Sequence, residues 1–177
     1  MKLAALHLRQ RDGVTCGPTV AVVAGALLDP GRQAKLSDPA WFAGEQARVH
    51  REVNRLWPRR LGTTPTGMAR ALTARSSPAG VRYRWRLFHG RRDSLSDVQH
   101  SAEAGRPVAM LTGRFLPRHW VLVVEADRRR WRCYEPSSGE VRSVEVDAVR
   151  RSRLSGLGYP RPFAFVLPRE STRSATS

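Results

Sequence analysis

The chain has 177 residues, a formal net charge of +16 and an apolar fraction of 41%. This length and composition are typical of one globular domain with a substantial core, and they argue against a disordered chain. Its two cysteines, Cys16 and Cys133, fit neither a disulfide-dense framework nor a metal-ligand spacing. We therefore expect free thiols and no metal or organic cofactor.

Almost all of the positive charge is arginine, because Lys2 and Lys35 are the only lysines. Such a charge could attract nucleic acid or an acidic partner. The arginines are spread along the whole chain, however, and no RRM, KH, zinc-finger or basic-arm pattern accompanies them. The composition therefore favours an acidic peptide or protein over nucleic acid, and an arginine-driven nucleic-acid protein remains the weaker alternative.

An apolar run near the N-terminus, Val20 to Leu28, is far shorter than a bilayer span. It also fits a signal peptide poorly, because Asp12, Thr15 and Pro18 interrupt the approach to it and no small-x-small cleavage site follows. We expect a cytoplasmic protein without membrane insertion.

Helical patterns dominate the first half of the chain. The run Thr19 to Leu28 is apolar all round, which predicts a central buried helix, and Pro18 suits its first turn. Ser37 or Asp38 should cap a second helix that ends near Trp57, in which His50 is interpreted as a surface histidine able to pair with Gln46. Two further short helices are predicted after Thr64 and after Asp93 or Ser94.

Strand patterns dominate the second half. Residues 81–87 alternate between apolar residues and arginine, which predicts a half-buried strand with a solvated arginine face. Further strands are expected at 107–112, 119–125, 130–135, 140–144 and 163–167, with a short helix near 147–154. Helices followed by sequential hairpins indicate an α+β fold with an antiparallel sheet. We expect one domain over residues 1–168 and a disordered tail over 169–177.

Four residues could form a site for acyl transfer. Cys16 lies at the start of the apolar helix, where unpaired backbone N–H groups favour a thiolate. His119 opens an apolar strand and could serve as its base, and Glu135 ends the neighbouring strand, where it could orient the imidazole. Gln10 could donate its amide N–H to an oxyanion together with the backbone N–H of Cys16. Cys133 lies inside a predicted strand and is interpreted as a core residue.

Three short motifs resemble the papain-like cysteine peptidases of the C39 and C39-like group: Gln10 with Cys16-Gly17-Pro18-Thr19, the segment His119 to Val124, and the segment Glu135 to Gly139. The resemblance implies a papain-like fold, with N-terminal helices packed on an antiparallel sheet. It also implies that Cys16 is the nucleophile, His119 the base, Glu135 the third member of the triad and Gln10 the oxyanion donor.

Two positions differ from the group's pattern, because Thr15 and Glu135 stand where the group usually has aspartate. The expected function is hydrolysis of a peptide or other amide bond, with deamidation and acyl transfer to an amine left open within the same chemistry. The alternative is a binding module that keeps the fold without turnover. The substrate and the oligomeric state are not specified by these motifs.

Overall fold

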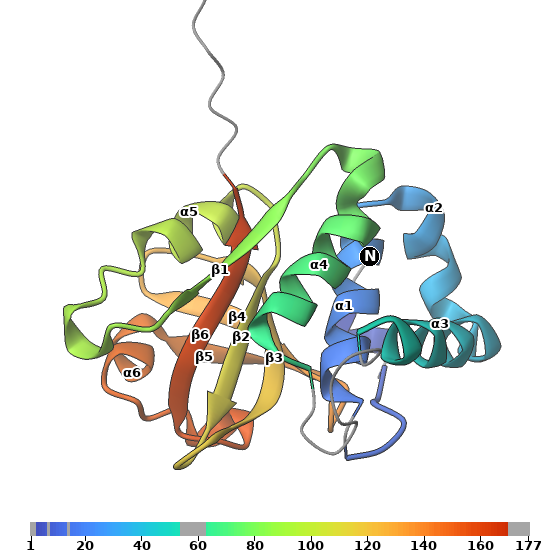
Figure 1. Cartoon of the computed structure of the whole chain (residues 1–177). Coiled ribbons are helices and arrows are strands. Elements are labelled where there is room, and N and C mark those ends of the chain that lie inside the picture. Colours follow the sequence, from blue (N-terminus) through green and yellow to red (C-terminus); the bar gives the residue numbers. More distant parts are fainter. Residues whose placement is uncertain (1–2, 7, 14, 54–62, 170–177) are drawn as a thin grey trace, which may run out of the picture.

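An antiparallel sheet lies between two groups of helices (Figure 1). The computed structural model describes residues 3–6, 8–13, 15–53 and 63–169. The helices are α1 (Cys16–Leu27), α2 (Pro30–Gln33), α3 (Pro39–Val53), α4 (Pro65–Ser76), α5 (Ser96–Glu103) and α6 (Val146–Arg150). The strands are β1 (Tyr83–Leu87), β2 (Val108–Gly113), β3 (Pro117–Ala126), β4 (Arg130–Glu135), β5 (Glu140–Glu145) and β6 (Arg161–Pro168).

Within the described chain the strands follow the order β1-β6-β2-β3-β4-β5, and every neighbouring pair is antiparallel. From β2 to β5 each strand pairs with the next one in the chain, as the predicted hairpins require. The last strand, β6, lies between β1 and β2. Local turn signals could not reveal this insertion, because it joins segments that are far apart in the sequence.

The helix α1 is the centre of the first core. Every residue from Cys16 to Ala26 is buried, since α1 is surrounded by α3, α4 and the sheet. This environment accounts for the apolar character of its whole circumference: a helix with neighbours on all sides has no face left for water.

A second core fills the opposite face of the sheet, beneath α5 and α6 (Figure 1). Trp131 and Phe165 meet there edge to face, with ring centroids 6.2 Å apart. The predicted fold class, α+β with N-terminal helices packed on an antiparallel sheet, is confirmed. The second helical layer was not predicted, because α5 and α6 are short and their apolar positions are few.

The half-buried interpretation of the first strand is wrong in detail. Tyr83 is buried, but Trp85 and Leu87 are 43% and 58% exposed. The arginine face is not wholly solvated either: Arg86 forms ion pairs of 2.6 Å with Asp93 and Asp97. The cause is position, because β1 is an edge strand whose apolar face extends beyond the cover of α4.

Two helix starts illustrate where local signals hold and where they fail. Asp38 caps α3, accepting hydrogen bonds from the N–H groups of Ala40 and Trp41 at 2.9 and 3.2 Å. The α5 helix instead begins after Leu95, which has a φ of 57°. Asp93 accepts the N–H of Leu95 at 3.0 Å and so holds this left-handed turn instead of capping the helix.

The predicted pairing of His50 with Gln46 is wrong. Gln46 is buried and hydrogen-bonds the backbone of Arg9 and Arg11, while Nε2 of His50 is buried and has no partner within the described ranges. The predicted end of α3 near Trp57 lies outside the described residues, and so do residues 170–177 of the predicted tail over 169–177. Arg169, the first residue of that tail, instead donates its N–H to the Arg82 carbonyl at 2.7 Å.

Candidate active site

The N-terminus of α1 is shaped by the turn that precedes it. The hydroxyl of Thr15 accepts the N–H groups of Arg11 and Asp12 at 3.1 and 3.0 Å, and its carbonyl accepts the N–H of Thr19 at 2.9 Å. The threonine that replaces the expected aspartate therefore closes this turn. Cys16 begins the helix, so its backbone N–H is one of those without a partner inside the helix.

Gly17 is required by close packing beside the thiol. A Cβ at this position would lie 2.3 Å from the Oγ1 atom of Thr63. This distance is too short for any side chain larger than a hydrogen atom unless Thr63 moves. The carbonyl of Thr63 in turn accepts the indole N–H of Trp120 at 2.8 Å. The segment before α4 is thereby fixed between the start of α1 and strand β3, next to the cysteine.

His119 is buried on β3, opposite Thr112 of β2. Its Nε2 atom lies 2.8 Å from Oε1 of Glu135, the last residue of β4. Nδ1, the other ring nitrogen, is then the one left for Cys16, whose side chain contributes to the raised pKa of His119. The sheet therefore places the imidazole between the thiol and the carboxylate, and the longer glutamate side chain makes this contact.

The turn after β4 holds the carboxylate in place. Oε1 of Glu135 also accepts the N–H of Ser137, and Oε2 accepts the N–H of Ser138, both at 2.8 Å. Burial by itself would raise the pKa of Glu135, but the hydrogen bonds from His119 and from this turn lower it to about 2. Glu135 is therefore ionised at neutral pH.

The pKa of His119 moves in the opposite direction. Burial by itself would lower it, but the hydrogen-bond and charge interactions of His119 with Cys16 and Glu135 raise it to about 9. At neutral pH the ring is therefore an imidazolium, with one N–H for the carboxylate and one for the sulfur.

Gln10 lies on the segment of residues 8–11, which is held from two sides. On the sheet side its N–H donates to the carbonyl of Pro136 at 2.7 Å, and the hydroxyl of Tyr134 donates to the carbonyl of Leu8 at 2.5 Å. On the helix side the amide of Gln46 binds both Arg9 and Arg11. The Oε1 atom of Gln10 is buried and has no hydrogen-bond partner among the described residues.

Two residues near the site were not singled out by the sequence patterns. Tyr159 lies beside His119, with ring centroids 5.7 Å apart and planes inclined by 41°. The preceding Gly158 has a φ of 86°, a conformation that glycine adopts most easily, so the Gly-Tyr pair is a local signal of a turn. Gln46 was identified only as a partner for His50, because the sequence does not reveal that the Gln10 segment crosses α3.

The second thiol belongs to the other core. Cys133 is wholly buried in the core beneath α5 and α6, and burial raises its pKa to about 12. Among the described residues no three His, Cys, Asp or Glu side chains gather as metal ligands do. Within the same ranges no helix has both the length and the apolar character to cross a bilayer.

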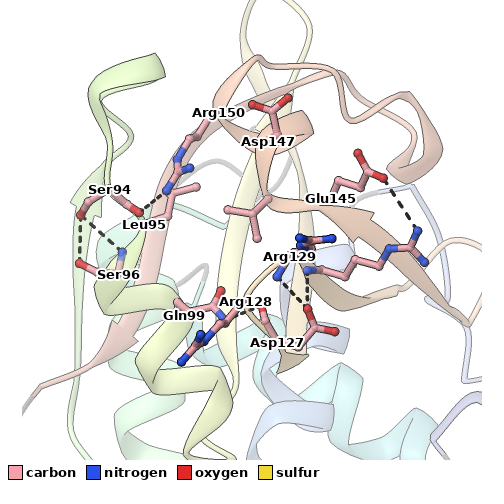
Figure 2. Close-up of a pocket in the computed structure, with 12 residues that line it drawn as sticks. Ser94, Leu95, Ser96, Gln99, Asp127, Arg128, Arg129, Glu145, Asp147 and Arg150 are labelled. Atoms are coloured by element: carbon pink, nitrogen blue, oxygen red, sulfur yellow. Dashed lines mark hydrogen bonds and ion pairs between the residues drawn. The ribbon is translucent and has the colours of Figure 1, made fainter.

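Figure 2 shows a cavity of about 1010 Å³ on the other face of the sheet, between the start of α5, the β3–β4 turn and the start of α6. Arginines and acidic residues alternate around it. Arg130 lies 3.9 Å from Glu145, and Asp127 accepts the N–H groups of Arg129 and Arg130. This cavity is lined by Leu95 and Val146 of the second core, whereas Cys16 belongs to the first, so it is separate from the thiol site.

The fold and the site together define a class: an α+β protein in which a helix N-terminus presents a cysteine to a histidine on the sheet, with a carboxylate on the far side of the ring. The fold in this description is the one that the papain-like resemblance implied.

No sequence-family model matches the chain, and no curated protein does. Solved structures similar to it include the peptidase domain of Streptococcus ComA, a bifunctional ABC transporter involved in quorum sensing (15% identity, 92% of this chain and 97% of that chain, TM-score 0.49). A double glycine motif protease from an AMS/PCAT transporter, solved with its leader peptide, is 12% identical over 91% of this chain and 88% of that one (TM-score 0.48). The peptidase C39-like domain of a toxin secretion ATP-binding protein from Vibrio parahaemolyticus is 13% identical (86% and 97%, TM-score 0.40). The group that the motifs resemble is therefore represented among these structures.

Proposed function

We propose that the chain is a cysteine hydrolase that cleaves a peptide or other amide bond, with Cys16 as nucleophile, His119 as acid and base, Glu135 as the group that orients His119, and Gln10 as oxyanion donor. One observation carries the proposal: a buried histidine contacts Glu135 through Nε2 at 2.8 Å and has its other nitrogen available to a cysteine at a helix start. Nucleophilic catalysis by a thiol needs these three groups in this order.

The reaction follows from the protonation states. In the first proposed step Cys16 transfers its proton to His119, the sulfur attacks the amide carbonyl carbon, and the C=O electron pair moves to oxygen. When the tetrahedral intermediate collapses, the N–H of the His119 imidazolium protonates the leaving nitrogen, and a thioester remains on Cys16. Water then attacks the thioester, with His119 accepting its proton, and the acid product leaves with the thiolate restored.

The oxyanion needs donors that are already in place. The backbone N–H of Cys16 is one, because the first N–H groups of a helix have no partner within it. Gln10 supplies the other in this proposal. Rotation about its last side-chain bond exchanges the amide oxygen and nitrogen. The buried oxygen position has no partner in the described part of the chain, which supports its use as a donor site for a substrate.

We further propose that residues 1–168 act as one domain and that the substrate is a peptide or protein. The steps above need no metal and no organic cofactor. If an amine instead of water attacks the thioester, the same site transfers the acyl group, and if the amide is a glutamine side chain, the same site deamidates it.

The test is cleavage of a peptide library, followed for the best substrate with single variants. We expect no turnover for Cys16→Ala, a severe loss for His119→Ala, and a loss of about 10² to 10³ in kcat for Gln10→Ala. His100→Ala is the matched control for the imidazole, because His100 is exposed on α5. Unchanged turnover by Cys16→Ala or His119→Ala contradicts the proposal.

A further inference from the structure

A cationic groove runs between α4 and the edge strand β1. Its volume is about 540 Å³. Four arginines line it, together with apolar and hydroxyl side chains and no Asp or Glu: Arg70, Arg82, Arg84 and Arg169. Trp85 forms part of its wall with 43% of its surface exposed. The groove therefore offers a flat aromatic surface among four positive charges.

Among the described residues, no carboxylate forms an ion pair with these arginines. The neighbouring Arg86 shows the contrast, because Asp93 and Asp97 both bind it on the other face of the strand. The cavity of Figure 2 differs as well, because three acidic residues line it beside its arginines and Glu145 lies 3.9 Å from Arg130. The α4–β1 groove thus gathers four arginines with no acidic residue in its lining.

The backbone of β1 is unpaired along the same groove. β1 lies at the end of the sheet and pairs only with β6. The bonds from Arg169 N–H to the Arg82 carbonyl and from Phe88 N–H to the Phe163 carbonyl show that the even-numbered residues face β6. The odd-numbered residues therefore point their N–H and C=O groups to the open edge.

Only part of that edge is covered. Thr73 of α4 accepts the N–H of Tyr83 at 2.9 Å, and the Leu87 carbonyl accepts the Arg86 side chain. Trp85 lies between these two residues, and neither its N–H nor its C=O has a partner in the described chain. An exposed edge of this kind is a template for another strand.

We propose that the α4–β1 groove binds an extended acidic peptide, which pairs with the backbone of Trp85 and places its carboxylates on the arginines. Charge complementarity specifies the acidic side chains, and the free donor and acceptor of Trp85 specify an extended polypeptide, since strand addition uses both. A nucleic-acid phosphate would satisfy the arginines and the N–H, but it has no hydrogen to donate to the Trp85 carbonyl.

The groove also lies close to the thiol. Thr66 lines one end of it, and Thr63, three residues earlier, packs against Gly17 beside Cys16. An intervening chain of this length spans at most about 10 Å. A peptide bound in the groove can therefore extend toward Cys16, although binding itself does not depend on hydrolysis.

The first test measures fluorescence anisotropy of a labelled peptide of about eight residues that alternates glutamate with threonine. We expect saturable binding that weakens with salt and is absent for the same peptide with glutamine in place of glutamate. The double variant Arg70→Glu/Arg84→Glu should bind at least about tenfold more weakly. The control Arg128→Glu/Arg129→Glu changes the charge equally at the cavity of Figure 2 and should bind as the wild type does. Equal losses in both variants overturn the proposal, because attraction would then come from net charge alone.

The second test isolates the backbone pairing. Trp85→Ala removes the indole and keeps the N–H, whereas Trp85→Pro removes both, at an edge position where proline is tolerated. With folding verified by thermal unfolding, we expect the proline variant to bind several-fold more weakly than the alanine variant. Equal affinity of the two variants overturns strand pairing. A single-stranded oligonucleotide of matched charge that binds more tightly, and loses affinity in the same groove variant, overturns the choice of a peptide.

Discussion

Replacing Glu135 by glutamine is the sharpest perturbation of the proposed site. The variant keeps the size of the side chain and removes its charge. In the wild type the N–H of Ser138 donates to Oε2 at 2.8 Å. If the amide oxygen of the variant keeps the bonds to His119 and Ser137, its NH₂ group takes the position of Oε2 and faces this N–H. Two facing donors cost about 1–3 kcal/mol at every pH.

A second part of the loss depends on pH. Folding raises the pKa of His119 from 6.5 to about 9, and a shift of this size corresponds to about 3 kcal/mol. Both side chains of the pair are less than a tenth exposed, so solvent screens the interaction little. Cys16 and Glu135 share this stabilisation, and we expect Glu135→Gln to lose about 1–3 kcal/mol of it.

The sign follows from the direction of each shift. A raised histidine pKa stabilises the folded state fully below pH 6.5, and the contribution disappears as the pH rises through 9. Glu135, whose pKa is lowered from 4.5 to about 2, contributes above pH 4.5 and loses its contribution as the pH falls through 2. The difference between wild type and variant should therefore be largest between pH 4.5 and 6.5 and shrink toward alkaline pH.

The assay is the free energy of unfolding measured in denaturant across this pH range, combined with an NMR titration of the His119 ring. Glu125→Gln is the control, because that carboxylate pairs with Arg132 at 2.8 Å but is 63% exposed. It should change stability by less than about 1 kcal/mol. A stability difference for Glu135→Gln that stays constant from pH 6.5 to about 9, with an unmoved His119 titration, would refute the reasoning.

Three further predictions concern packing and positioning. Gly17→Ala should lower stability by about 1–3 kcal/mol through its collision with Thr63, and Thr63→Gly should restore part of that loss in a thermal unfolding experiment. Arg86→Ala should destabilise by about 3–5 kcal/mol in denaturant, because it leaves a carboxylate that is only 4% exposed without its partner. Gln46→Ala should release the segment that carries Gln10, lowering kcat more than it changes KM and costing about 1–2 kcal/mol of stability.

Matched controls separate these effects from general damage. Gly13→Ala meets no atom within 4 Å and should be neutral, while Arg132→Ala removes an exposed ion pair and should cost less than about 1 kcal/mol. For Gln46, the conservative variant Gln46→Glu keeps the acceptor for Arg11 and loses the donor to Arg9, so it should lose part of the kcat. If Gln46→Ala lowers kcat no more than replacement of an exposed glutamine does, Gln46 has no positioning role.

The sequence predicted those parts of the fold in which local pattern and tertiary position agree. α1 is apolar all round and is buried all round, and β4 spans the predicted residues Arg130 to Glu135. The contact of His119 with Glu135 could also be predicted from the sequence, since adjacent strands of a hairpin bring their residues side by side.

The remaining features depend on long-range packing. Alternation in residues 83–87 identified a strand but could not show that it lies at an edge, where Trp85 and Leu87 stay exposed. Gln46 and Tyr159 reach the site through segments remote from it in the chain, so no spacing rule could place them there.

The central claim is that Cys16 is activated by His119 for attack on an amide. The most direct measurement is the rate at which a peptide-based electrophile that mimics an amide modifies the protein, with the labelled cysteine located by mass spectrometry. The proposal predicts labelling at Cys16 and not at the buried Cys133, with a severe loss of rate in His119→Ala and little change in His100→Ala. If Cys16 is labelled equally fast in His119→Ala, the claim that the protein is an enzyme is contradicted. The alternative, a binding module that has the fold without turnover, would then be favoured.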